Sequence, residues 1–132
     1  MSNLLSLSEA ATIGLHSMAL IAMSKEKLNV NQISEKIGSS RHHVAKVMQR
    51  LAKENFVASN RGPSGGFILK KKPDDITLLD IYEAIEGKIE DQTCPGNKEE
   101  CPFSECIMGD VSHKLTQDFI VFLKQQTLNK YL

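Results

Sequence analysis

The chain of 132 residues contains no tryptophan and few aromatic side chains, five Phe and two Tyr. It also lacks any apolar run of about 18 residues, so no membrane-spanning helix is expected. Hydrophobic residues make up 41% of the chain, which is ordinary for a globular protein. We therefore expect one small and mostly aliphatic core, with or without an appendage.

Two further features are missing. The start of the sequence, Met1 to Leu7, has no basic region followed by an apolar stretch, which argues against a secretory signal and predicts a cytoplasmic protein. The chain has three cysteines, an odd number that does not suit a closed disulfide framework. In a reducing compartment, clustered cysteines more often bind metal or respond to redox state.

The net charge is zero, but the charges are unevenly divided along the chain. Residues 1–75 hold 11 Lys or Arg and 6 Asp or Glu, a balance of +5. Residues 76–132 hold 5 Lys or Arg and 10 Asp or Glu, a balance of −5. This asymmetry favours contact between the first half and a polyanion, although a charge bias is more often just a solvated face.

The first third of the sequence carries the signals of two successive helices. Ser6 and Glu9 form a capping-box pattern, with Ser6 as the cap, which predicts a helix from there to about Met23. Asn29 opens a second helix with the same kind of pattern, and Gly38 offers the left-handed residue that ends it.

A third helix is expected to begin at Ser39 or Ser40 and to end near Asn55. Its apolar residues are spaced as one buried stripe: Val44, Val47, Met48 and Leu51. The opposite face carries hydrogen-bond donors: His42, Lys46, Gln49 and Lys53, flanked by Arg41, His43 and Arg50. The third helix therefore has the two faces that a DNA-reading helix needs.

The segments that follow predict a β-hairpin and two more helices. Strands are expected at residues 56–59 and 67–69, with a turn between them. Thr77 caps a fourth helix that Gly87 closes, and a long helix is expected over roughly residues 107–127.

Two helices joined by a short Gly-containing turn, followed by a hairpin, are in the order of a winged helix-turn-helix. Residues near the start of the reading helix enter the major groove most deeply, so the candidate base contacts are Ser40, Arg41, His42, His43 and Lys46. Gln49 lies on the same face, and Arg50 and Lys53 are expected at phosphates. Without the hairpin, a solvated basic helix face would be an equally good interpretation.

The hairpin turn strengthens the DNA-binding interpretation. It reads Arg61-Gly62-Pro63-Ser64-Gly65-Gly66-Phe67. Glycines let a backbone approach another surface closely, and an arginine at the tip suits insertion into a narrow minor groove. The alternatives are a tight hairpin with one exposed Arg, or a nucleotide phosphate loop, which lacks the GxxxxGK[ST] pattern and a following helix start.

These segments resemble the IscR/NsrR-type winged-helix regulators of bacteria, the Rrf family of type two. The hairpin turn carries the resemblance, together with Pro73, Ile76-Thr77-Leu78, Asp80-Ile81 and Ala84-Ile85-Glu86-Gly87. The helical start and the three cysteines also match. The resemblance implies a homodimer, joined largely through its last helix, that binds duplex operator DNA and acts mainly as a repressor. The reading helix starts with Arg41-His42-His43, which differs from the Tyr-Leu-Glu type of start in many relatives.

The three cysteines are spaced C-x6-C-x4-C at Cys94, Cys101 and Cys106. Thiolates suit iron–sulfur clusters and zinc, but the paired knuckles that zinc prefers are missing. The resemblance implies a [2Fe-2S] or [4Fe-4S] cluster in this segment. Bare redox-active thiols remain the alternative. The candidates for a fourth cluster ligand are Glu99, Glu100, Glu105, His113 and the partner subunit's Glu9.

The last helix carries a broad apolar stripe: Ile107, Met108, Val111, Leu115, Phe119, Ile120, Phe122 and Leu123. We expect this stripe to pack against a second copy, the alternative being packing within one subunit. The prediction is a DNA-binding domain over residues 1–75. Residues 76–132 would then hold a helix, a cysteine loop at 88–106 and a dimerisation helix. No nucleophile and base or acid pair stands out, so the chain is not expected to be an enzyme.

Overall fold

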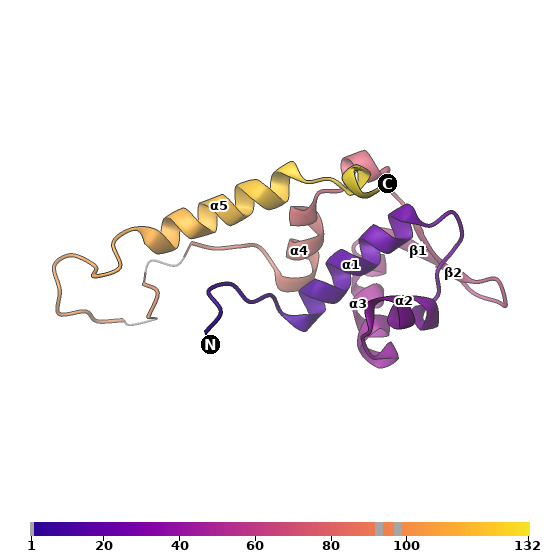
Figure 1. Ribbon diagram of the computed structural model, residues 1–132, viewed down its shortest axis with the longest axis horizontal. Helices are drawn as coiled ribbons and strands as arrows, with labels where there is room; N and C mark the ends of the chain where they lie inside the picture. The colour runs from indigo at the N-terminus through magenta and orange to yellow at the C-terminus, as the bar shows by residue number, and fades with distance from the viewer. Residues whose placement is uncertain (1, 92–93, 97–98) are drawn as a thin grey trace.

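The structure of the protein is a computed structural model that describes residues 2–91, 94–96 and 99–132. In chain order the elements are α1 (Glu9–Met23), α2 (Val30–Ile37), α3 (Arg41–Lys53), β1 (Val57–Asn60), β2 (Gly66–Leu69), η1 (Pro73–Asp75), α4 (Leu78–Glu86), α5 (Val111–Gln125) and η2 (Leu128–Tyr131). Figure 1 shows the hairpin at one end of the long axis, with α5 running toward the other end. The predicted fold class, mostly α with a small β-hairpin wing, is confirmed.

The central helix is α1, which contacts α2, α3 and α4. Its N-cap is Ser8, whose Oγ accepts a hydrogen bond from the amide of Ala11 at 3.0 Å. The predicted cap at Ser6 is therefore wrong by two residues, because the hydroxyl that reaches a first-turn amide belongs to Ser8. The buried residues of α1 form one broad face, which α2, α3 and α4 share in covering: Ala11, Ile13, Gly14, Ser17, Met18 and Ile21.

The next two helices form the predicted pair. Asn29 and Gln32 make a reciprocal capping box at the start of α2. Gly38 ends this helix with a φ of 72°, and Ser40 caps α3 by accepting a hydrogen bond from the amide of His43 at 3.2 Å. The predicted apolar stripe of α3 is confirmed as its buried face: Val44, Val47, Met48 and Leu51.

The hairpin is joined to the helical body at its base. β1 and β2 pair antiparallel, with Val57 opposite Leu69. Phe67 also pairs with Leu28 in the connector between α1 and α2, and its amide donates to the Leu28 carbonyl at 2.8 Å. This extra hydrogen bond joins the second strand of the wing to the connector that leads into α2. The first strand begins at Val57, one residue later than predicted, because the Phe56 amide donates to the Leu51 carbonyl of α3 at 3.0 Å in the turn that precedes the strand.

Residues beyond 75 contribute to the same core as the first half. Ile76 and Ile81 belong to its buried cluster. Leu128 of η2 is fully buried, and its amide donates to the Ile76 carbonyl at 3.0 Å. The amide of Leu78 donates to the Gln126 carbonyl at 2.9 Å, so the segment after α5 is joined to the start of α4. The two predicted parts therefore share one core. Their predicted roles, DNA binding for residues 1–75 and a cysteine loop with a dimerisation helix for residues 76–132, stay a prediction.

The last long helix is shorter than predicted. α5 spans Val111–Gln125 rather than residues 107–127, since Gly109 adopts a φ of 61° in a turn before it and Thr127 pairs with Thr77 after it. Several of its apolar residues are exposed: Val111, Leu115, Val121 and Phe122. In the described part of the chain, no helix is long and apolar enough to cross a membrane.

Candidate nucleic-acid interface and cysteine segment

The start of α3 presents the predicted base-reading side chains. Ser40 keeps its hydroxyl on the His43 amide, while Arg41 and His42 are exposed. The His43 side chain is 33% exposed, and its Nδ1 lies 3.4 Å from Oε1 of Glu9 in α1. The first turn of α3 therefore offers Arg41 and His42 outward, whereas His43 is partly engaged within the protein.

Further along α3, the outward face divides into two kinds of residue. Lys46, Gln49 and Lys53 are exposed. Arg50 is also exposed, but its Nε donates a hydrogen bond to the Ala84 carbonyl of α4 at 2.9 Å. The sequence placed Arg50 and Lys53 together at phosphates, and the structure gives them different surroundings.

Close contacts within the protein require two of the glycines of the wing. A Cβ added at Gly65 would lie 2.3 Å from the Asn60 carbonyl oxygen, and one at Gly66 would lie 2.8 Å from that of Leu28. Both distances are too short for a side chain, so these glycines allow the hairpin to close on itself and on the helical body. Gly62 has a φ of 114°, a left-handed conformation that favours glycine next to the exposed Arg61.

A groove between the start of α2 and the wing adds residues that the sequence interpretation missed. It has a volume of about 410 Å³ and includes Asn29, Asn31 and Arg61 in its lining. Asn31 Oδ1 accepts a hydrogen bond from Nη1 of Arg41 at 3.4 Å, which links α2 to the start of α3. No local sequence pattern predicts that Asn29 and Asn31 lie beside the wing, because it is the pairing of Phe67 with Leu28 that brings the wing beside α2.

The cysteine segment lies at the end of the long axis opposite the wing (Figure 1). Cys94 is half-buried, whereas Cys101 and Cys106 are exposed. Residues 92, 93, 97 and 98 of the predicted loop lie outside the described residues. Among the described residues, no group of three or more His, Cys, Asp or Glu side chains is gathered to hold a metal ion. The three cysteine thiols of this segment are nevertheless the kind of donor that suits an iron–sulfur cluster.

The candidates for a fourth ligand have separate surroundings. His113 Nδ1 lies 3.0 Å from Oδ2 of Asp91, and Glu9 faces His43. Glu99, Glu100 and Glu105 are exposed. The candidates therefore differ in their surroundings, since His113 and Glu9 face other side chains and the three glutamates of the segment are exposed.

α4 connects the helical body to this segment and to α5. The ring of Tyr82 meets that of Phe119 in α5 edge to face, at 5.5 Å between centroids and 86° between planes. Burial raises the pKa of the Tyr82 phenol, and the nearby charge of Glu86 raises it further. Beyond α4, the Ile89 amide donates to Oε2 of Glu83 at 3.1 Å, which holds the first residues after the helix.

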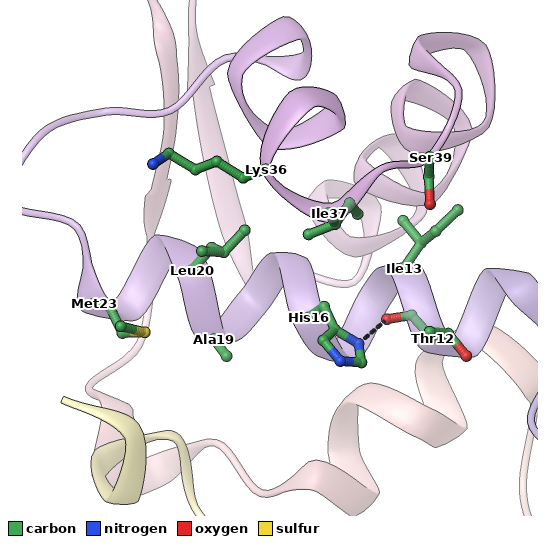
Figure 2. A pocket seen from close by; sticks show the side chains of 9 residues that line it. All are labelled: Thr12, Ile13, His16, Ala19, Leu20, Met23, Lys36, Ile37 and Ser39. Carbon is green, nitrogen blue, oxygen red and sulfur yellow. Dashed lines mark hydrogen bonds between the residues drawn. The ribbon is translucent and has the colours of Figure 1, made fainter.

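A separate pocket of about 430 Å³ lies between α1 and α2 and is drawn in Figure 2. Its lining is largely apolar, with His16 and Lys36 as the titratable side chains, and His16 Nδ1 is 2.7 Å from the Thr12 carbonyl oxygen. The nine described lining residues include no carboxylate. The pocket therefore lacks the acid and base pairing of a hydrolytic site.

Comparison with known proteins decides the family. The Rrf2 family, described as an iron-dependent transcriptional regulator, matches residues 7–132. The chain belongs to the Rrf2 family. It is thus a DNA-binding transcriptional regulator and not an enzyme, as the sequence predicted.

Individual Rrf2 relatives agree in sequence and in fold. An HTH-type transcriptional regulator of Aquifex aeolicus is 31% identical over 125 residues, 92% of this chain and 87% of that protein. The HTH-type transcriptional regulator IscR of Erwinia tasmaniensis is 34% identical over 97 residues, which cover 73% of this chain but only 58% of that relative. The solved structure of T. potens IscR has a TM-score of 0.74 at 25% identity, covering 95% of this chain and 84% of that one. CymR, the global cysteine regulator of B. subtilis, shares the fold with a TM-score of 0.76 at 24% identity, covering 96% and 95% of the two chains.

Proposed function

We propose that this Rrf2 protein is a homodimeric repressor whose operator affinity is controlled by a [2Fe-2S] or [4Fe-4S] cluster on Cys94, Cys101 and Cys106. The observation that carries the proposal is the position of these thiols. They lie between α4, which packs on the reading half of the protein, and α5, whose apolar face is exposed. A change in the shape of the thiol segment can therefore act on both helices through the covalent chain. Iron–sulfur status, nitric oxide or redox state would be the signal.

The DNA contacts follow from the exposed face of α3 and from the wing. In the proposal, Ser40, Arg41, His42, His43, Lys46 and Gln49 face the major groove. Arg61 enters the minor groove, and the turn of Gly62, Pro63, Ser64, Gly65 and Gly66 lets it approach. Lys53 contacts phosphate.

The proposed dimer uses the uncovered face of α5. Leu115 is 46% exposed and Phe122 is 53% exposed, although both are large apolar side chains. Apolar surface of this kind, continuous along a helix, is typical of an interface. A second copy of the same helix would cover it, since most such contacts are two-fold symmetric.

The cysteine segment fits a ligand that organises it. When bound, a cluster supplies a redox-responsive cross-link between three points of this segment. The side chains at 99–110 are all exposed, so the segment has no core of its own to hold a shape. Glu9 of the partner subunit, Glu105 and His113 are the candidates for the remaining ligand position.

A second candidate function is regulation through the cysteine thiols without iron. Cys101 and Cys106 are exposed, and no metal-holding group is gathered among the described residues. Exposed thiols can form disulfides or be oxidised without any metal.

The experiment is purification of the full chain without oxygen, followed by a visible absorption spectrum and assays of iron and sulfide. We expect absorption bands from thiolate-bound iron, and their loss in Cys94→Ala, Cys101→Ala and Cys106→Ala proteins. Ser104→Ala, an exposed change in the same segment, is the matched control and should keep the spectrum.

Binding of cluster-loaded and cluster-free protein to a duplex selected from a random pool then tests control of DNA affinity. Unequal affinity supports the proposal. Colourless protein that stays iron-free after reconstitution would overturn cluster control and favour the thiol mechanism. Equal affinity of the two forms would show that the segment does not regulate DNA binding.

A further inference from the structure

The last turn of α4 receives a hydrogen bond from the reading helix. The carbonyl groups in the last turn of a helix have no partners within that helix. Ala84 lies in this turn, and its carbonyl accepts from Nε of Arg50 at 2.9 Å. The guanidinium thereby places a positive charge at the negative end of the α4 dipole, where a cation is stabilising.

We propose that Arg50 is a positioning residue that fixes the direction of α3 relative to α4, rather than a contact to DNA phosphate. The residue lies in the last turn of α3, so its contact acts on the end of the helix whose start reads the bases. A small rotation at this end would displace Arg41 and His42 at the other. In this proposal the Arg50 guanidinium contacts α4 of its own chain rather than DNA, although the sequence pattern groups Arg50 with Lys53.

Other contacts gather at the same turn. The Ser8 hydroxyl, at the cap of α1, donates to the carboxylate of Glu86, the final residue of α4. The Glu83 carboxylate holds the Ile89 amide just beyond the helix. The end of α4 is therefore the place where α1, α3 and the segment leading to the cysteines are joined by hydrogen bonds.

Salt dependence of DNA binding separates the two roles of Arg50. Log affinity falls linearly as log salt concentration rises. Losing one phosphate contact makes this decline shallower, by about 0.9 in the slope per subunit. A lost positioning contact lowers affinity at every salt concentration and leaves the slope unchanged. The test compares full-length Arg50→Gln, Arg50→Ala and Lys53→Gln proteins on a duplex that the wild-type protein selects from a random pool.

The expected results differ for each substitution. Glutamine at position 50 keeps a donor for the Ala84 carbonyl without the charge, so Arg50→Gln should keep the wild-type slope and most of the affinity. Arg50→Ala should lose about fivefold in affinity, the change equivalent to one net hydrogen bond, with an unchanged slope. Lys53→Gln should lower the slope. A slope that falls as much in both Arg50 variants as in Lys53→Gln would overturn the proposal.

Hydrogen exchange gives a readout in the absence of DNA. Amides of the last turn of α4 and of Ile89 should exchange faster in Arg50→Ala than in wild-type protein, and at the wild-type rate in Lys53→Gln. Unchanged exchange in Arg50→Ala would also contradict the positioning role.

If the proposed cluster control holds, Arg50 is one route by which the cysteine segment acts on α3. This part rests on the proposed function. The affinity difference between the cluster-loaded and cluster-free forms should then be smaller in Arg50→Ala than in the wild-type protein. Equal affinity of the two wild-type forms would refute cluster control alone, because the salt slope and hydrogen exchange decide the positioning role separately. An undiminished difference in Arg50→Ala would refute the route.

Discussion

The contact between α1 and α4 allows a quantitative test of how closely the helices are packed. Gly14 of α1 faces Ile85 of α4, and a Cβ at position 14 would lie 2.0 Å from Cδ1 of Ile85. The same Cβ would lie 3.4 Å from Cγ1 of Ile85 and 3.5 Å from Cγ1 of Val47, both close to ordinary contact. Carbon atoms attract best at about 3.5–4.0 Å, so a single methyl group on Ile85 accounts for most of the overlap.

Two opposing effects set the cost of Gly14→Ala. Alanine gains about 1 kcal/mol over glycine in a helix interior, and overpacking of a core costs about 1–3 kcal/mol. We therefore expect Gly14→Ala to lower the free energy of unfolding by up to about 2 kcal/mol. Ile85→Val removes Cδ1 and alone should cost about 0.5–1.5 kcal/mol. In the double variant the overlap is gone and the helix gain remains, so its stability should return to within about 0.5 kcal/mol of wild type.

The assay is urea unfolding of the four proteins, followed by circular dichroism at one fixed protein concentration, because self-association would change apparent stability. The double-mutant cycle should give a favourable coupling of about 1–3 kcal/mol with unchanged m values. Additive effects, or a Gly14→Ala protein that is more stable than wild type, would refute the close approach of α1 and α4.

Three smaller predictions concern single side chains. Because folding raises the pKa of Tyr82, the folded state holds the phenol proton more tightly than the unfolded state does. The free energy of unfolding should therefore fall as pH rises above the ordinary phenol pKa of about 10. Tyr82→Phe should flatten this part of a curve of stability against pH. Ser17 is fully buried, and its Oγ has no hydrogen-bond partner among the described residues, so Ser17→Ala should raise the free energy of unfolding in urea by up to about 1 kcal/mol; a clear loss would contradict this. Asn29→Ala removes one half of the α2 capping box and should lower the melting temperature by the equivalent of about 1 kcal/mol, whereas no change would show that the cap is dispensable.

Local patterns predicted the helices of the first half of the protein well. The stripe of Val44, Val47, Met48 and Leu51 is a property of one helix, and it is buried as expected. The cap at Ser6 was wrong because two serines lie near the helix start, and only the folded backbone decides which hydroxyl reaches a free amide.

Features that depend on distant contacts were less predictable. Spacing alone groups Arg50 with Lys53 as a predicted phosphate contact and gives no sign of its hydrogen bond to the Ala84 carbonyl, because that carbonyl is 34 residues away. The cysteine segment has no apolar periodicity, so its sequence indicates the chemistry of a ligand set but not where the thiols lie. The glycines of the wing were expected to serve close approach to DNA, and for Gly65 and Gly66 the structure adds contacts within the protein.

The backbone pairing that joins the start of α4 to the segment after α5 also affects how far the chain can tolerate changes of length. Thr77 pairs with Thr127, so the stretch that holds α4, the cysteine segment and α5 leaves the core and returns to it at one place. α4 packs on α1 within that stretch, and the loop between α4 and α5 is its exposed part. Doubling the length of such a loop adds only about 0.6 kcal/mol of closure entropy. A longer or shorter segment around the cysteines should therefore cost the folded core little stability, because the pairing of Thr77 with Thr127 closes the same stretch in each case.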